Sequence, residues 1–400
     1  MRQFLIGIVV TAVTVLAMLG MVEVAQRVAP SLIGIAILER FEPGLRSEIA
    51  ARLGMSTRND TLVIASEQRV DRGPDINLGL PNRRYVRAVD EVDAAAGAVD
   101  HYETDALGFC NPPGVAEVRP IDVLTVGGSI PNCAAVAGEN NFTTWLGREL
   151  QAASYNMAVP GVGPYEYVEV LRRFGLALKP RVVVMAVSEG DDLDDVLSHH
   201  RFIARAGKPR RKRTSGGLFS ISYALAFFKG GIELAVRTIK DSGGPDFRYE
   251  VKVQGGKVPL NVANHDASEL EVARLVDAGK VAPDVYADSL GKFAALAREG
   301  GFRPLVVMVP SAYTTYLPTI RYSDGAIAPV MERFAVTQRR WLEKTATDAG
   351  MAYFDATPYM QKAAADRPLL YFPSNIHLTP EGHKALAEAV APAVRALLAQ

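Results

Sequence analysis

Ser129 and His377 are the two residues of this sequence that could act together as a nucleophile and a general base. Ser129 directly follows the apolar run 121–128, and a nucleophile needs exposure at a strand end, with small residues before it that let a substrate approach. His377 precedes a predicted helix start, with Thr379 as cap and Pro380 in the first turn. Each residue alone is typical of an ordinary turn. Together they indicate serine-dependent acyl chemistry, provided that both loops flank one sheet.

Apolar strands that alternate with helices are expected to position this pair. The runs 121–128 and 181–188 are typical of strands buried on both faces of a parallel sheet. The alternation predicts a doubly wound α/β fold with a parallel five-stranded sheet, in which function gathers at the carboxyl ends of the strands. Further strands are expected at 154–159, 303–310 and 351–357, and helices at 141–153, 164–178, 286–301, 339–350 and 380–399.

The amino terminus predicts a membrane anchor. Residues 4–22 contain no charged residue and are just long enough to cross a bilayer core of about 30 Å as a helix. A cleaved signal peptide is the alternative, but its apolar core is usually about 7–15 residues long. The nearest candidate cleavage residue, Ala25, also has Glu23 two positions before it. We therefore predict an uncleaved transmembrane helix over residues 1–27 that contacts the lipid bilayer through residues 4–22.

The rest of the chain divides by its pattern. Residues 28–100 show no sustained period and indicate a tether with an irregular N-terminal region, whereas residues 101–400 form the predicted α/β domain. An insertion over about residues 197–280 interrupts the alternation. Its basic run, 204–217, is most simply a solvated loop. The apolar stretch 218–239 is either a core-packing helix of a cap, which we favour, or a surface helix lying against lipid beside the anchor.

Charge and cysteine content exclude several other classes of protein. Lysine plus arginine and aspartate plus glutamate number 44 each, so no global basic field favours nucleic acid, and we predict no nucleic-acid partner. Cys110 and Cys133 are the two cysteines, and no histidine spacing near them suggests a zinc site. We predict neither a metal nor a cofactor. The two cysteines are either free buried thiols or, in an oxidising compartment, a single bridge.

Four short motifs in this order resemble the sequence blocks of the SGNH (GDSL-type) hydrolase family. The resemblance covers roughly residues 100–400 and extends to the segments 105–109 and 309–313, the second of which is typical of a membrane-anchored bacterial branch. The four motifs are Gly-Gly-Ser at 127–129, Asn-Met-Ala-Val-Pro-Gly-Val-Gly at 156–163, Glu-Gly-Asp-Asp-Leu at 189–193 and Ser-Asn-Ile-His-Leu-Thr-Pro-Glu-Gly-His at 374–383.

The resemblance implies a serine esterase mechanism. Ser129 would attack an ester carbonyl with His377 as general base, and the oxyanion would be held by the Ser129 amide, Gly161 and Asp191. Related proteins handle acetyl esters of envelope polysaccharides or transfer acyl groups to them. The implied substrate is therefore an acylated envelope polysaccharide or another ester. The implied location is the bacterial inner membrane, with a single span and the C-terminal domain in the periplasm.

The resemblance also implies a disulfide. It puts Cys110 and Cys133 near one strand end, beside the nucleophile. A bridge there requires Cα atoms about 4.4–6.8 Å apart.

Three departures from the family pattern affect the expected activity. Gly128 stands where the family has an aspartate that braces the nucleophile loop, and Asp191 stands where it has an oxyanion-hole asparagine. The aspartate that should orient the histidine is replaced by Ser374 and Asn375. Two hypotheses remain: an ester hydrolase or acyltransferase with a modified site, or a catalytically inactive scaffold that serves as a binding or accessory subunit of a membrane protein assembly.

Overall fold

A computed structural model describes most of the chain, and the chain divides into two compact units. We name them the helical unit (Met1–Asp60, Arg84–Ala88 and Arg210–Gly244) and the α/β unit (Thr61–Arg83, Val89–Pro209 and Pro245–Gln400). Nearly all of the predicted basic loop, 204–217, lies outside the described residues. The described residues are 2–56, 61–64, 76–204, 217–241, 245–254, 256–264, 267–375 and 377–400.

The α/β unit contains the predicted parallel five-stranded sheet. Its spatial order is β12-β10-β7-β5-β6, and every pairing is parallel. Numbered along the chain, this is the order 2-1-3-4-5 of flavodoxin-like doubly wound sheets. All residues of β5 and β7 are buried, as their apolar runs predict. The strands are β5 (Val123–Gly127), β6 (Ser154–Asn156), β7 (Val182–Ser188), β10 (Arg303–Val309) and β12 (Ala352–Asp355).

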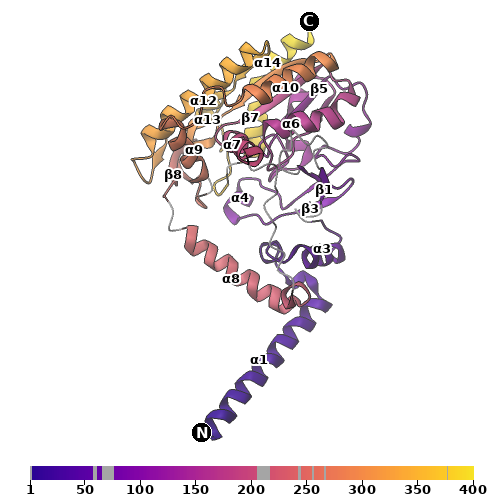
Figure 1. Cartoon of the computed structure of the whole chain (residues 1–400), viewed down its shortest axis with the longest axis vertical. Helices are drawn as coiled ribbons and strands as arrows, with labels where there is room; N and C mark the ends of the chain where they lie inside the picture. Colours follow the sequence, from indigo (N-terminus) through magenta and orange to yellow (C-terminus); the bar gives the residue numbers. More distant parts are fainter. Residues whose placement is uncertain are drawn as a thin grey trace. The chain divides into compact units, whose positions relative to one another are not determined.

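Helices flank this sheet. α5 packs against α14, and α6 packs against α10 (Figure 1). Two predicted helix starts are confirmed by their caps. The Asn141 side chain accepts a hydrogen bond from the Thr144 amide (2.8 Å), and the Thr379 side chain accepts one from the Gly382 amide (3.1 Å). The helices are α4 (Glu91–Ala95), α5 (Phe142–Leu150), α6 (Pro164–Val170), α7 (Asp191–Ala204), α9 (Ala267–Asp277), α10 (Ala287–Gly300), α11 (Ala312–Thr315), α12 (Ala328–Asp348), α13 (Thr357–Asp366) and α14 (Pro380–Leu398).

The predicted boundary at residue 100 differs from the structure. β2 belongs to the α/β unit because its residues Ile76 and Leu78 are buried in the main core, and α4 belongs to the same unit. The 197–280 insertion is also divided, since only Arg210–Gly244 is part of the helical unit. The smaller strands are β1 (Thr61–Ile64), β2 (Ile76–Gly79), β3 (Arg84–Val86), β4 (His101–Glu103), β8 (Tyr249–Val253), β9 (Gly256–Leu260) and β11 (Arg321–Tyr322).

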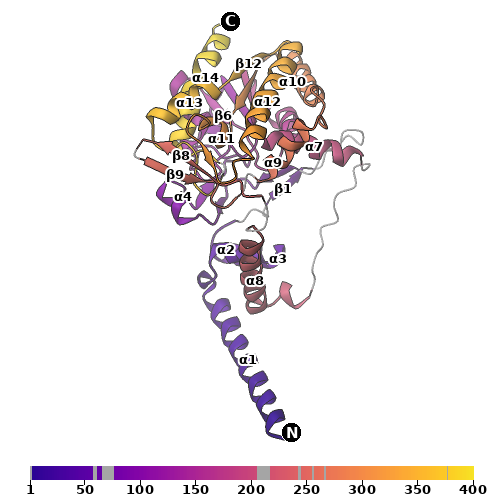
Figure 2. The ribbon, with the colours of Figure 1, turned by 90° about the vertical axis from the view of Figure 1, so that its left-hand side faces the viewer.

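The helical unit is built on the N-terminal helix α1 (Arg2–Val28). Its segment Val9–Val28 is long and apolar enough to cross a membrane, and only 6% of the most apolar window is buried. The unit's own core joins α2 (Ile35–Leu38), α3 (Pro43–Arg52) and α8 (Tyr223–Asp241). The sequence pattern favours a cap of the α/β domain for the stretch that forms α8. Instead, this helix packs against α1 and α2 (Figure 2), because its buried side chains complete the core of the helical unit.

Candidate active site

Ser129 lies in the turn that follows β5. In a sheet of order 2-1-3-4-5, the chain leaves the first and third strands toward opposite sides, so a crevice opens between their carboxyl ends. These strands are β5 and β7, which pair from Val123↔Val182 to Gly127↔Ala186. Ser129 follows one of them and Asp191 the other. The topology therefore places both residues at the point where such folds bind ligands.

The segment after Ser129 is held by hydrogen bonds to the second motif and by the disulfide. Asn156 Nδ2 donates to the Pro131 carbonyl (3.1 Å), and Asn132 Nδ2 donates to the Ala158 carbonyl (2.7 Å). Cys110 and Cys133 form the disulfide that the resemblance implied, with Cα atoms 6.1 Å apart. The nucleophile loop is therefore fixed on both of its sides.

The loop that carries His377 packs against the same disulfide. Phe372 shares a small buried cluster with Cys110, Cys133 and Val136, and the Phe372 amide donates to the His377 carbonyl (2.9 Å). None of the hydrogen bonds found among the described residues joins the Ser129 side chain to His377. The Nδ1 atom of that ring lies 2.9 Å from Asn375 Oδ1.

A buried aspartate that the sequence reasoning missed lies behind this asparagine. Asp93 on α4 is 2% exposed. Its carboxylate accepts hydrogen bonds from the Ser374 amide (2.8 Å), from the Ser374 hydroxyl and from Asn375 Nδ2 (2.5 Å). Ser374 thus holds the aspartate, and Asn375 connects it to His377. The motif lacks its own aspartate, and α4 supplies one.

These contacts fix the tautomer of His377. Asn375 Nδ2 faces a carboxylate, so Oδ1 is the atom that faces His377, where it accepts the backbone amide (2.9 Å) as well. An amide oxygen can only accept, so His377 Nδ1 must carry the proton. In the neutral ring, the lone pair is then on Nε2. This is the tautomer that a general base for a serine hydroxyl requires.

The second motif lies directly against the nucleophile loop. A Cβ atom at Gly128 would stand 3.4 Å from the Val162 carbonyl oxygen, and one at Gly163 would stand 2.6 Å from the Cβ of Asp195. Gly161 has a φ of +75°, which favours glycine, and it is exposed with open space around its Cα. The motif therefore lies between the Ser129 loop and α7.

Gly128 is explained by its neighbours Tyr167 and Asp192. A Cβ atom at this position would stand 2.7 Å from the Tyr167 hydroxyl, so the site has no room for the family's aspartate. The Tyr167 hydroxyl donates to Asp192 Oδ1 (2.5 Å), and the Ser188 amide donates to Asp192 Oδ2 (2.7 Å). The carboxyl of Asp192 stands 3.5 Å from the Cβ position of Gly128. Asp192 therefore comes close to the space that a side chain at position 128 would need.

Three carboxyl groups gather at the start of α7. Oxygens of Asp191, Asp192 and Asp195 lie within 4.8 Å of one another. Burial, and then the charge of Asp194, raise the pKa of Asp191. Burial raises the pKa of Asp195 to about 7, with Asp191 as the next cause. No lysine or arginine is an ion-pair partner of Asp191 among the described residues, so its environment favours the protonated form, which can donate a hydrogen bond.

The same three carboxyl groups could by geometry hold a cation. The sequence predicts no metal site. Both oxygens of Asp192 already accept hydrogen bonds from protein groups, and proximity of acidic groups alone does not identify an ion. We therefore assign no metal to this cluster.

The segments 105–109 and 309–313, to which the family resemblance extends, support the loops around the site. Asp105 Oδ1 accepts the amides of Leu107 (2.8 Å) and Phe109 (3.1 Å), which closes the turn over 105–109. In the segment 309–313, the Ser311 amide donates to a Glu189 carboxyl oxygen (2.9 Å). Burial raises the pKa of Glu189 to about 7. Both segments therefore fix the backbone of loops near the site.

Comparisons with known proteins give matches among solved structures. No family model matches the sequence, and no curated protein matches it. The structure is similar to TesA, with 14% identity, a TM-score of 0.38 and coverage of 69% of this chain and 99% of that chain. It is also similar to the acetyl xylan esterase AlAXEase, with 13% identity, a TM-score of 0.36 and coverage of 68% and 99%. A third match is an extracellular lipase from Streptomyces rimosus, with 11% identity, a TM-score of 0.38 and coverage of 68% and 99%. The matched structures include hydrolases of the family that the sequence motifs resemble.

Proposed function

We propose that this chain is a membrane-anchored serine acyl hydrolase or acyltransferase of the SGNH type, with a modified active site. The observation that carries the proposal is the hydrogen-bonded chain from Asp93 through Asn375 to His377. The start of the helix after His377 requires only its cap, Thr379. It does not require a buried carboxylate and an oriented amide that hold a histidine in the tautomer of a general base. They supply the orienting group that the sequence motif lacks.

In this proposal Ser129 Oγ attacks the ester carbonyl while its proton moves to His377 Nε2. The oxyanion is stabilised by the amides of Ser129 and Gly161 and by the protonated carboxyl of Asp191. His377 then protonates the departing alcohol, which leaves an acyl group on Ser129. Water releases this acyl group in a hydrolase, and the hydroxyl group of an acceptor takes it in a transferase.

The proposed substrate class is an acyl or acetyl ester of an envelope polysaccharide, and the proposed location is the periplasmic side of the bacterial inner membrane. The Cys110–Cys133 disulfide supports an oxidising compartment. The segment Val9–Val28 of α1, which is apolar enough to cross a membrane, supports the proposed attachment to a bilayer through residues 4–22.

A second candidate function is an inactive scaffold that binds a partner in a membrane protein assembly. The carboxyl group of Asp191 at the oxyanion position favours it, because an ionised carboxylate there would repel the developing negative charge. The raised pKa of Asp191 opposes this effect, since it extends the pH range of the neutral form.

Labelling with a fluorophosphonate probe tests the proposal and separates the two candidates. The full chain in detergent should be labelled, and both Ser129→Ala and His377→Ala should abolish the labelling. The same preparations should be assayed with a short-chain acetyl ester, which the wild type should hydrolyse and Ser129→Ala should not. If the folded wild type is not labelled, the scaffold is the better assignment. Ester turnover that persists in Ser129→Ala refutes the proposed nucleophile.

A further inference from the structure

Helix α8 of the helical unit has apolar side chains on two opposite faces. Tyr223, Ala226 and Gly230 are buried on one face. On the other face Phe228, Ile232 and Val236 follow one another at a spacing of four, which places them in a single stripe along the helix. Their exposed fractions are 48%, 64% and 43%, and Ile221 just before the helix is 62% exposed. We call Phe228, Ile232 and Val236 the outer stripe.

The inner face already provides the contacts that fold the unit. Tyr223 and Ala226 pack with Leu38 and Ile49 in its core. A Cβ atom at Gly230 would stand 3.2 Å from the Ile37 carbonyl oxygen, so α8 and α2 approach closely there. The outer stripe is not needed for this packing. Apolar side chains that are exposed in a row therefore require another explanation, such as an interaction surface.

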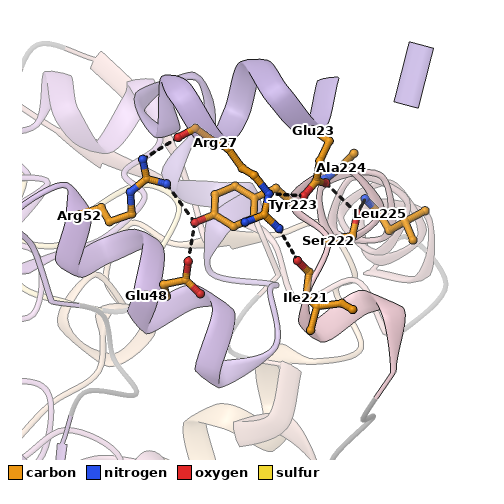
Figure 3. A network of polar contacts seen from close by, with 9 residues as sticks. All are labelled: Glu23, Arg27, Glu48, Arg52, Ile221, Ser222, Tyr223, Ala224 and Leu225. Atoms are coloured by element: carbon orange, nitrogen blue, oxygen red, sulfur yellow. Dashed lines mark hydrogen bonds and ion pairs between the residues drawn. The ribbon is translucent and has the colours of Figure 1, made fainter. Parts of the chain in front are cut away.

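A polar network fixes the beginning of α8 to the end of the apolar span of α1 (Figure 3). One Glu23 oxygen accepts both the Ser222 hydroxyl and the Ala224 amide, each at 2.8 Å. Arg27 donates to the Ile221 carbonyl (2.7 Å) and pairs with Glu23 (2.6 Å). Glu23 and Arg27 are the charged residues that follow the uncharged segment 4–22. The first turn of α8 therefore lies at the end of that uncharged segment.

Contacts from α3 complete the same network. Arg52 donates to the Arg27 carbonyl at the end of α1 (2.6 Å) and to the Tyr223 hydroxyl (3.2 Å). The Tyr223 hydroxyl in turn donates to Glu48 (2.9 Å), and the Arg27 guanidinium lies 4.6 Å from the centre of the Tyr223 ring. Three helices are thus joined at one point. α8 leaves this point crosswise to α1 rather than alongside it (Figure 1).

We propose that α8 is an interfacial helix that lies on the membrane surface with its outer stripe among the lipid acyl chains. This proposal rests on the proposed insertion of α1 into a bilayer. When α1 spans, a helix that starts at the end of its apolar segment and runs crosswise lies along the headgroup region, as amphipathic surface helices do. Exposed apolar residues at the end of α1 and just beyond it, Val24, Val28 and Leu32, belong to the same unit. The proposed function already places α1 in a bilayer, so the bilayer is the occupant that we assign to the outer stripe.

The test uses the full chain in lipid vesicles, with single cysteines added by substitution. Both native cysteines are joined in the disulfide, so an added cysteine can be labelled selectively with an environment-sensitive fluorophore. Ile232→Cys probes the outer stripe. Glu233→Cys on the same helix is the matched control, because it is exposed on another side. Leu16→Cys probes the span of α1.

We expect the label at position 232 to be quenched by lipids that carry a nitroxide on the acyl chain and to be protected from iodide in water. The label at position 233 should behave in the opposite way. Equal exposure of both labels to iodide overturns the proposal while leaving the anchor intact, provided that the label at position 16 is quenched by the lipid. A label at position 16 without lipid quenching refutes the anchor itself. Protection at position 232 that requires a high protein-to-lipid ratio, without lipid quenching, assigns the stripe to a second copy of the chain and also overturns the proposal.

Discussion

Replacing Asp93 by asparagine should disable His377 without touching either proposed catalytic residue. The carboxylate of Asp93 accepts three hydrogen bonds, from two Ser374 groups and from Asn375. An asparagine in its place offers one acceptor oxygen and turns an N–H₂ group toward the same donors. At least one donor then loses its partner, and the constraint on the orientation of the Asn375 amide is weakened.

The magnitude follows from the tautomer. If the Asn375 amide rotates so that Nδ2 faces the ring, His377 Nδ1 must accept, and the proton moves to Nε2. A serine protease histidine held in the wrong tautomer loses about 10⁴ in kcat, and a general base contributes about 10²–10⁴. We therefore expect Asp93→Asn to lower the rate constant of fluorophosphonate labelling by about 10²–10⁴. Hydrogen bonds to a charged group contribute about 1.5–3 kcal/mol each, so the free energy of unfolding should fall as well.

The assay is the rate constant of labelling of Ser129 as a function of pH, measured well below the unfolding temperature of each variant. Wild type should be labelled faster than Asp93→Asn across the pH range, because only wild type holds His377 in the tautomer of a general base. Glu91→Gln is the matched control, because Glu91 is exposed on the same short helix. A purely structural role of Asp93 would lower only the unfolding temperature. Folded Asp93→Asn with the labelling rate and pH profile of wild type would falsify the orienting role.

Three further outcomes are expected. Burial raises the pKa of Asp191, and its neutral, donating form is lost as pH rises through that pKa, so ester turnover should fall on the alkaline side. Asp191→Asn should remove this fall, and a variant with an unchanged pH profile contradicts the oxyanion role. The folded form holds a proton on Asp195 up to about pH 7, whereas the unfolded chain loses it near pH 4, so the stability that this proton gives at low pH is lost as pH rises through this window. The unfolding temperature of Asp195→Asn should therefore depend less on pH than that of wild type, and an equal pH dependence of the two proteins contradicts this role of Asp195. Reduction of the Cys110–Cys133 bridge, whose cysteines are 23 residues apart in the chain, should lower the free energy of unfolding by about 3 kcal/mol. Denaturant titrations with and without reductant measure this difference, and equal free energies of unfolding would show that the bridge does not stabilise the fold.

The sheet could be predicted from the sequence because its information is local. The runs 121–128 and 181–188 are apolar without interruption, and a strand buried on both faces needs nothing else. The caps of α5 and α14 could also be predicted, because an asparagine and a threonine stand where the first backbone amides of these helices need hydrogen-bond acceptors. The early start of α12 at Ala328 was missed. Its buried residues Met331, Phe334, Ala335 and Gln338 have the helical spacing that would have revealed it.

The site was less predictable because its orienting groups come from distant segments. Asp93 and Ser374 are 281 residues apart in the chain, and the surrounding stretch 90–100 has no pattern that separates a buried aspartate from a solvated one. The close approach of Tyr167 to Gly128 likewise depends on how α6 packs. The composition of the helical unit also escaped prediction, since α8 is distant in sequence from the helices that it covers. Motifs identify candidate nucleophiles and bases, whereas tertiary packing decides what orients them.

The placement of α8 in the helical unit has a consequence for the order in which the protein folds during synthesis. Chains emerge from their amino terminus, and domains generally fold as they become complete. α1, α2 and α3 are made first, but Tyr223 and Ala226 of their core are made only after β5, β6 and β7 of the α/β unit. Until then, Ile49 and Leu38 lack part of their apolar contacts. The helical unit would thus be among the first parts made and among the last to complete its core.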